Sequence, residues 1–260
     1  MMMRAVPWLI GALFTIALSE PAHAQRGRNY CSLPGGSASL MLVDRTSPYS
    51  TDGEDRQGER IAAGVDALLD GLGSGDRLTI ATIERHRRLS TITFDNCFPG
   101  CDESRRNPIP FLNDCPRATI DSERQNFRRR LYRAIIPLLE NAQDQPNSDI
   151  TGTVFQMSAH HRFSRIYIFS DMLENSQVLP WQNFSNRPAS ESLSAVQRSG
   201  FVPTLRGAEI QVVGFGLSHA RSRAALTDAQ DRTIRDFWRL YFEAAGAEIS
   251  YRTAIDASER

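Results

Sequence analysis

Arg165-Ile-Tyr-Ile-Phe-Ser170 is the stretch of sequence that decides the fold, and Asp171-Met172 follows it directly. Its four consecutive apolar residues include two isoleucines and two aromatic residues, a composition typical of a strand buried on both faces. Strands of this kind belong to parallel sheets that are covered by helices on both sides. The stretch therefore predicts an α/β domain with an acidic residue just beyond the carboxyl end of a central strand.

Similar apolar runs alternate with helical patterns along the rest of the chain. Strands are predicted over residues 39–43, 78–83, 89–94, 209–215 and 248–251, and helices over 54–72, 120–142, 150–161, 190–198 and from Thr227 onward. The polar turn at 85–88 is short, so the strand after it is expected to run antiparallel to the strand before it. We expect a three-layer, Rossmann-like α/β fold whose mostly parallel sheet has about six strands and one antiparallel edge strand.

Two local features of this pattern carry their own expectations. Pro137 lies inside the helical pattern over 120–142, where a proline is expected to kink or break the helix. The segment between Asp171 and the helix at 190–198 has no clear periodicity and is expected to be a long loop.

Composition excludes several classes of function. The 260 residues carry 30 basic and 30 acidic side chains, so no net charge attracts nucleic acid or an anionic membrane. Every basic residue other than histidine is arginine, because the sequence contains no lysine. Schiff-base catalysis and a phosphate-binding loop with its lysine are therefore excluded.

Residues 1–24 have the pattern of an export signal. A short positive segment ending at Arg4 precedes an apolar run over 5–18, and Ala22-His23-Ala24 has the small-x-small form of a cleavage site. The apolar run has about fourteen residues, whereas a membrane-spanning helix needs about twenty. We predict a cleaved signal peptide and a periplasmic or secreted mature protein without a membrane span; a retained anchor is the alternative.

Four cysteines fit an oxidising compartment. An even number predicts two disulfides, and the spacing of Cys97 and Cys101, with lone cysteines on either side, makes a zinc site the weaker alternative. The third strand should run opposite to the first, so its exit near Cys97 should lie at the rim where the first strand enters, near Cys31. This geometry predicts the pairs Cys31–Cys97 and Cys101–Cys115.

Oxygen-bearing side chains gather where two strands are predicted to end. Asp44 and Thr46 follow the first strand, Asp171 follows the strand at 165–170, and Ser148 lies in a turn between two helices. Ligands of such sheets bind at the carboxyl ends of the strands, beside the point where strand order reverses. Carboxylate and hydroxyl oxygens are the ligands that Mg²⁺ prefers.

In these residues the chain resembles the von Willebrand factor A-like domains. Their metal-ion-dependent adhesion site is written D-x-S-x-S after the first strand, with a Thr in an inter-helix turn and an Asp after the fourth strand. Asp44 and Thr46 match the first two ligands, Asp171 matches the last, and Ser148-Asp149-Ile150 resembles the family's T-[ND]-I turn, with Thr151 as a weaker hydroxyl candidate. The likeness covers about residues 37–253, and it extends to exported bacterial proteins of unassigned role that carry Asp-Arg-Thr-x-Pro and Ser-Asp-Met-Leu at these places.

One position departs from the family's pattern. Pro48 stands where the second Ser is expected, and Ser47 and Ser50 are out of register with it. A missing oxygen ligand weakens a magnesium site, so a metal-binding site and a degenerate, metal-free site both stay open.

The resemblance implies an exported protein-binding module rather than an enzyme. It implies a domain over 37–254 with a cysteine-containing loop at 97–116, between an N-terminal segment at 25–36 and a tail at 255–260. The implied cofactor is Mg²⁺, with Mn²⁺ as a substitute, and the implied partner is another protein that offers an acidic side chain. A metal-dependent phosphohydrolase with Asp44 as its nucleophile and a metal-free structural scaffold are the alternatives, although Thr46 replaces the second acid that such a phosphohydrolase needs.

Overall fold

The computed structural model describes residues 29–47, 57–102, 115–216 and 225–252. The predicted signal peptide, Pro48, most of the predicted cysteine-containing loop and the predicted tail lie outside these residues. Among the helices of the described ranges, none combines the length and the apolar character needed to cross a bilayer.

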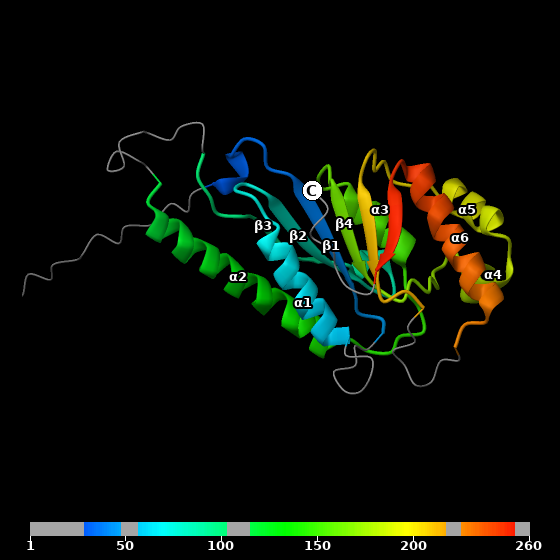
Figure 1. The fold of residues 1–260 in the computed structure, drawn as a ribbon. Coiled ribbons are helices and arrows are strands. Elements are labelled where there is room, and N and C mark those ends of the chain that lie inside the picture. Colours follow the sequence, from blue (N-terminus) through cyan, green and yellow to red (C-terminus); the bar gives the residue numbers. More distant parts are fainter. Residues whose placement is uncertain (1–28, 48–56, 103–114, 217–224, 253–260) are drawn as a thin grey trace, which may run out of the picture.

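The described residues alternate between strands and helices, as the sequence pattern predicts (Figure 1). The strands are β1 (Ala38–Asp44), β2 (Arg77–Ile83), β3 (Ile92–Cys97), β4 (Arg165–Phe169), β5 (Glu209–Val213) and β6 (Glu248–Arg252). The α-helices are α1 (Gln57–Asp70), α2 (Arg117–Glu140), α3 (Ile150–Ser158), α4 (Trp181–Asn186), α5 (Ala189–Arg198) and α6 (Asp228–Ala245). Two 3₁₀ turns, η1 (Tyr30–Ser32) and η2 (Arg87–Leu89), precede β1 and β3.

The strands form one six-stranded sheet in the order β3-β2-β1-β4-β5-β6. All neighbouring strands pair in parallel except β3, which runs antiparallel to β2 at one edge. The chain builds outward from β1 to β3, then returns to place β4 on the other side of β1. Strand order therefore reverses between β1 and β4, and the predicted fold class is confirmed.

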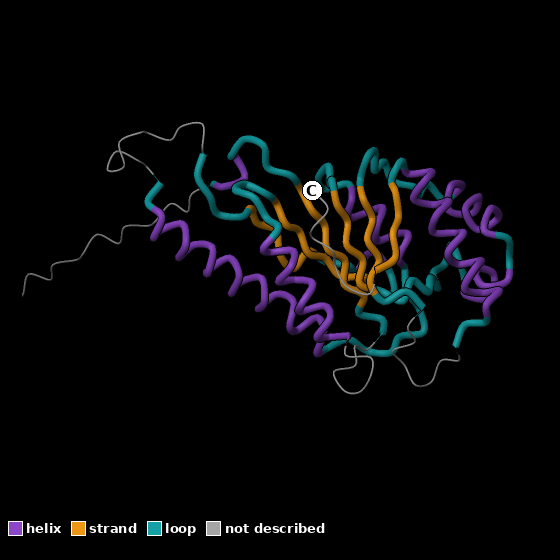
Figure 2. Tube along the Cα trace, viewed as in Figure 1, coloured by secondary structure: helices purple, strands orange, loops and turns teal. Residues whose placement is uncertain are grey.

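Two apolar layers enclose the sheet because its central strands are buried on both faces. Met41 and Val43 of β1 pack with α1 and α2 on one face, whereas Leu40 and Leu42 pack with α3 to α6 on the other. Figure 2 shows the strands between these two groups of helices. The last helix contributes the largest part of the second layer: Ile234, Phe237, Trp238, Tyr241 and Phe242 are fully buried.

Helix α6 begins and ends at signals that were readable in the sequence. Thr227 forms a capping box with Gln230, in which each side chain bonds to the other residue's backbone N–H. Gly246 ends the helix in the left-handed conformation with φ of 81°, which glycine adopts without a steric cost.

Three of the predicted local features differ from the structure. The third strand begins at Ile92 rather than at residue 89, because residues 87–89 form η2, in which the His86 side chain accepts a hydrogen bond from the Arg88 N–H. The segment expected to be a loop after Asp171 contains helix α4, which begins directly after Pro180. Pro137 does not break α2, since three further helical residues follow it before the helix ends at Glu140.

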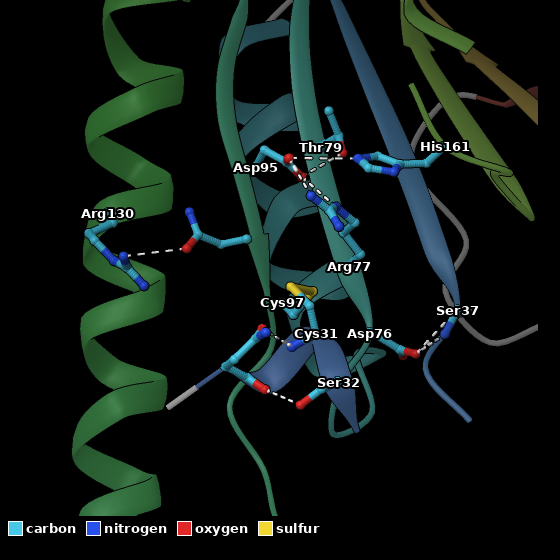
Figure 3. The surroundings of a disulfide bond; sticks show 12 residues. Cys31, Ser32, Ser37, Asp76, Arg77, Thr79, Asp95, Cys97, Arg130 and His161 are labelled. Carbon is cyan, nitrogen blue, oxygen red and sulfur yellow. Dashed lines mark hydrogen bonds and ion pairs between the residues drawn. A yellow bond between two sulfur atoms is a disulfide. The ribbon is translucent and has the colours of Figure 1, made fainter. Parts of the chain in front are cut away.

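Both predicted cysteine pairs form disulfides. Cys31 bonds to Cys97 with a Cα–Cα distance of 5.1 Å, and Cys101 bonds to Cys115 with a distance of 5.9 Å. The first bridge ties the segment before β1 to the end of edge strand β3 (Figure 3).

An ion pair closes the same edge of the sheet. Asp95 of β3 accepts two hydrogen bonds from the Arg77 guanidinium at 2.8 and 2.6 Å, and a third from Thr79 at 3.0 Å (Figure 3). The hydrogen bonds from Arg77 are the largest cause that lowers the pKa of Asp95. Where β2 begins and β3 ends, this edge of the sheet is therefore fixed by both a disulfide and a bidentate ion pair.

Removal of the first disulfide should destabilise the protein more than removal of the second. The Cys31–Cys97 bridge spans 66 residues and the Cys101–Cys115 bridge spans 14. The loop-entropy relation gives losses of about 4 and about 3 kcal/mol, respectively. Urea unfolding of the C31S/C97S and C101S/C115S variants measures both losses, and an unchanged midpoint for C31S/C97S would contradict the expectation.

Candidate functional site

The reversal of strand order brings the loops after β1 and β4 together at the carboxyl rim of the sheet. Asp44, the last residue of β1, is 1% exposed. Its Oδ1 accepts hydrogen bonds from the backbone N–H and the hydroxyl of Thr46 at 2.9 and 2.7 Å. Its Oδ2 accepts one at 2.6 Å from the hydroxyl of Ser170, which follows β4. Asp44 and Thr46, both predicted site residues, are thus in direct contact.

Asp171 is joined to the same first loop through a different serine. The Ser47 hydroxyl donates to Asp171 Oδ2 at 3.2 Å, and the Leu173 N–H donates to Oδ1 at 3.0 Å. Asp171 is 2% exposed and Ser47 is equally buried. The structure therefore connects both predicted aspartates across the β1–β4 switch point, each by a hydroxyl from the opposite loop.

Ser148 lies on a third segment beside these loops. Its backbone forms an antiparallel bridge with Asn175, with N–O distances of 3.1 and 3.0 Å. The Ser148 side chain is 5% exposed, and its Oγ has no hydrogen-bond partner among the described residues. A buried hydroxyl without a partner is uncommon, and among the described residues nothing occupies the lone pairs of Ser148 Oγ.

Asp149 caps the helix that follows. Its Oδ1 accepts from the Gly152 N–H at 3.1 Å, while its Oδ2 accepts from the backbone N–H and the guanidinium of Arg87 at 2.9 and 3.1 Å. Gly152 is required here, since a Cβ would lie 2.3 Å from Asp149 Oδ1 and 2.7 Å from Arg87 Cδ. These contacts fix α3, and with it Ser148, against the turn after β2.

Glu174 holds the loop after β4 to the same helix end. Its Oε2 accepts from the backbone N–H groups of Ile150 and Thr151, each at 2.9 Å, and the Thr151 hydroxyl lies 3.3 Å from Oε1. The side chain is completely buried, and this desolvation raises the pKa of Glu174 to about 8, with the negative charge of Asp149 adding to the effect. Thr151, the weaker hydroxyl candidate, is therefore engaged by Glu174.

The loop between Ser170 and Asn175 is also tied to α6. Met172 is fully buried and adopts a left-handed backbone with φ of 61°, which is uncommon for a residue with a side chain. Its N–H donates to Ser170 Oγ at 2.9 Å, and its carbonyl accepts from the Trp238 indole N–H at 3.0 Å. The position of Asp171 is therefore set by contacts on both sides of it.

Three residues of this rim went unassigned at the sequence level. Ser47 is out of register with the family's pattern, yet it contacts Asp171 because the loop after Asp44 turns back toward β4. Ser170 and Glu174 flank Asp171 in sequence, and their positions in Ser-Asp-Met-Leu-Glu were the available signal. Their roles depend on partners more than 20 residues away, which periodicity does not reveal.

The donor set is compatible with a hard divalent cation. The side chains are two carboxylates and the hydroxyls of Thr46, Ser47, Ser148 and Ser170. Oxygens of this kind suit Mg²⁺ and Mn²⁺, and the unpartnered Ser148 Oγ has lone pairs to offer. Among the described residues no group of three or more acidic, histidine or cysteine side chains converges on one point, so an ion at this rim would need hydroxyl ligands.

Comparisons with known proteins identify no family for this chain. No protein-family model matches the chain, and no curated protein matches its sequence. Among solved structures, the VWA domain of SpRpn10 is similar over 83% of this chain and 87% of that chain, with 10% identity and a TM-score of 0.38. A likeness this distant supports no transfer of function or of site residues to this chain.

The buried Glu174 predicts a specific dependence of stability on pH. Its pKa lies near 8 in the folded protein, above the ordinary value of 4.5, so folding favours the protonated form. Its contribution is fully present below about pH 4.5 and is lost as pH rises toward 8, with a slope of about 1.4 kcal/mol per pH unit. Urea unfolding of wild type and Glu174→Gln in EDTA between pH 5 and 9 measures the difference. Parallel pH profiles would contradict the assignment.

Proposed function

We propose that this protein is an exported protein-binding module of the von Willebrand factor A type, which captures an acidic side chain of its partner through a divalent cation at the carboxyl rim. The observation that carries the proposal is the concentration of buried acids. Asp44, Asp149, Asp171 and Glu174 are the buried acidic side chains of the described chain, and all four lie around the β1–β4 switch point.

Burial of these acidic side chains costs free energy of folding, so their concentration at one rim supports a functional role. A carboxylate removed from water costs free energy even when it is hydrogen-bonded, and replacement by a neutral residue is often tolerated in a purely structural setting. Asp149 and Glu174 have structural roles as acceptors at the start of α3. Asp44 and Asp171 each accept one backbone N–H as well, and the hydroxyls that also donate to them remain able to offer a lone pair to a cation.

The proposed ion is Mg²⁺, with Mn²⁺ as a substitute, and Asp44, Thr46, Ser148 and Asp171 are the proposed ligands. When bound, it would supply a positive charge to an acidic side chain of the partner. Attraction of this kind in a partly dry site exceeds that of an exposed ion pair, which contributes about 0–1 kcal/mol. Pro48 supplies no hydroxyl, so we propose that Ser47 or Ser170 stands in for the missing one.

The compartment supports this role. Two disulfides are stable in an oxidising environment, and the N-terminal export pattern leads to the same place. We therefore propose a periplasmic or secreted protein whose partner is also exported.

Calorimetric titration with Mg²⁺, and then with Mn²⁺, tests the cation. We expect a saturable heat with wild type and its loss in Asp171→Asn, which removes one negative charge but keeps the shape of the side chain. Asp70→Asn, on the exposed surface of α1, is the matched control and should bind as wild type does. Absence of heat with wild type would refute the metal-dependent part of the proposal.

A phosphatase assay separates this proposal from the hydrolytic alternative. Asp44 is 1% exposed and its two oxygens accept hydrogen bonds from Thr46 and Ser170, so it is poorly placed to attack a phosphate. We expect no turnover of an aryl phosphate with Mg²⁺. Turnover that disappears in Asp44→Asn would identify an enzyme instead.

A further inference from the structure

A cavity of about 560 Å³ lies beside the proposed cation site. Ser148 and Leu173 line it, and these residues belong to the two segments that carry or adjoin the proposed ligands. Its volume is within the range of small-ligand sites, about 300–1,000 Å³. Ser148 is the one described lining residue that is also a proposed ligand of the cation, so the chemistry of the other lining residues requires its own explanation.

The walls of the cavity are partly apolar, and one polar side chain holds two of the apolar residues in place. Pro146, Leu173, Trp181 and Leu226 supply the apolar surface. The side-chain amide of Asn175 accepts a hydrogen bond from the backbone N–H of Trp181 at 2.8 Å and donates one to the Pro146 carbonyl. Both of its polar atoms are therefore used to position two opposing walls, and Asn175 is a positioning residue rather than a ligand contact.

Two other polar groups of the cavity are left without partners. Ser148 Oγ is buried and has no hydrogen-bond partner among the described residues. The Oε1 of Gln230 accepts hydrogen bonds from the backbone N–H and the hydroxyl of Thr227 in the capping box of α6. The Nε2 group of Gln230 has no acceptor within the described chain.

The charge of the lining limits the class of ligand. Asp144 is the single ionisable residue among the described lining residues, and it is exposed. The remaining polar groups are neutral amides and a hydroxyl. The described lining offers no positive counter-ion to an anionic group, and its one carboxylate, on Asp144, is exposed; a neutral group with hydrogen-bonding atoms and an apolar side chain matches the remaining lining.

We infer that this cavity binds an uncharged, apolar peptide segment of the partner protein, with a main-chain amide of that segment at Ser148 and Gln230 and its side chain against Trp181 and Leu226. This inference rests on the proposed function, because that function is what makes the occupant of the cavity part of a protein. It names a second point of contact, adjacent to the acidic side chain that the cation would hold.

Tryptophan signals make the test specific. The sequence has three tryptophans, Trp8, Trp181 and Trp238, so the Trp8→Phe variant of the full chain retains two indole N–H groups. Trp181 lines the cavity, whereas the Trp238 indole is fully buried and bonded to the Met172 carbonyl. Proton–nitrogen NMR of this variant therefore contains one signal that reports on the cavity and one internal reference.

The probe is N-acetyl-leucine methylamide, titrated in EDTA so that no cation takes part. We expect a saturable shift of the Trp181 indole signal while the Trp238 signal stays in place. Ser148→Ala should weaken binding of the probe by about threefold to tenfold, the range expected for one hydrogen bond. Ser192→Ala is the matched control: it removes another buried hydroxyl without a partner, in α5, and should leave binding unchanged.

Each alternative outcome has a definite meaning. No saturable shift of the Trp181 signal, equal shifts of both signals, or equal binding by wild type and Ser148→Ala would overturn the inference. An unchanged Trp238 signal in Ser148→Ala verifies that this variant is folded. Because the probe titration contains no cation, its failure is distinguishable from a failure of the Mg²⁺ titration. Heat with Mg²⁺ but no probe binding would refute only the peptide-binding cavity. Probe binding without heat from Mg²⁺ would refute only the cation site.

Discussion

A buried carboxylate is stable only if hydrogen-bond donors replace the water that it loses, and this constraint organises one end of the molecule. Asp44 receives a donor from Ser170, 126 residues further along the chain, and Asp171 receives one from Ser47, 124 residues earlier. Neither acid is satisfied until β1 and β4 lie side by side in the correct register. The site and the centre of the sheet therefore form together, and a change that loosens one is expected to loosen the other.

The loop after β4 is the element on which several contacts converge. Glu174 fixes it to the start of α3, and Trp238 of α6 fixes it through the Met172 carbonyl. Both contacts are buried, so the loop is held by the hydrophobic layers on one side of the sheet as well as by the polar rim. Such support keeps side chains in a defined geometry, which a binding site requires for selectivity. The left-handed conformation of Met172 persists because these neighbours determine it.

In the proposed function, the rim and the cavity divide recognition between two kinds of chemistry. Around Asp44 and Asp171 the groups are acidic or hydroxylic, whereas the cavity between Pro146, Trp181 and Leu226 combines apolar side chains with neutral amides and one exposed carboxylate. Ser148 belongs to both, since it is a proposed ligand of the cation and also lines the cavity. A partner that offers an acidic side chain next to an apolar one would satisfy both regions, and a partner with only one of them would bind less tightly.

The sequence alone determined the layers of this protein, because buried strands and amphipathic helices leave periodic patterns that do not depend on distant partners. It located β1, β4 and α6, the antiparallel edge, both disulfides, and the polar positions Asp44, Thr46, Ser148 and Asp171. It missed η2 and α4, where local capping and packing outweigh propensity, and the helix that it predicted over 120–142 continues past Pro137 without a break. Only the tertiary structure decided which hydroxyl faces which acid, that Thr151 is engaged by Glu174, and that the Ser148 hydroxyl has no hydrogen-bond partner among the described residues. Hydrogen bonds between residues more than a hundred positions apart follow from strand register and loop direction, and neither leaves a trace in local sequence pattern.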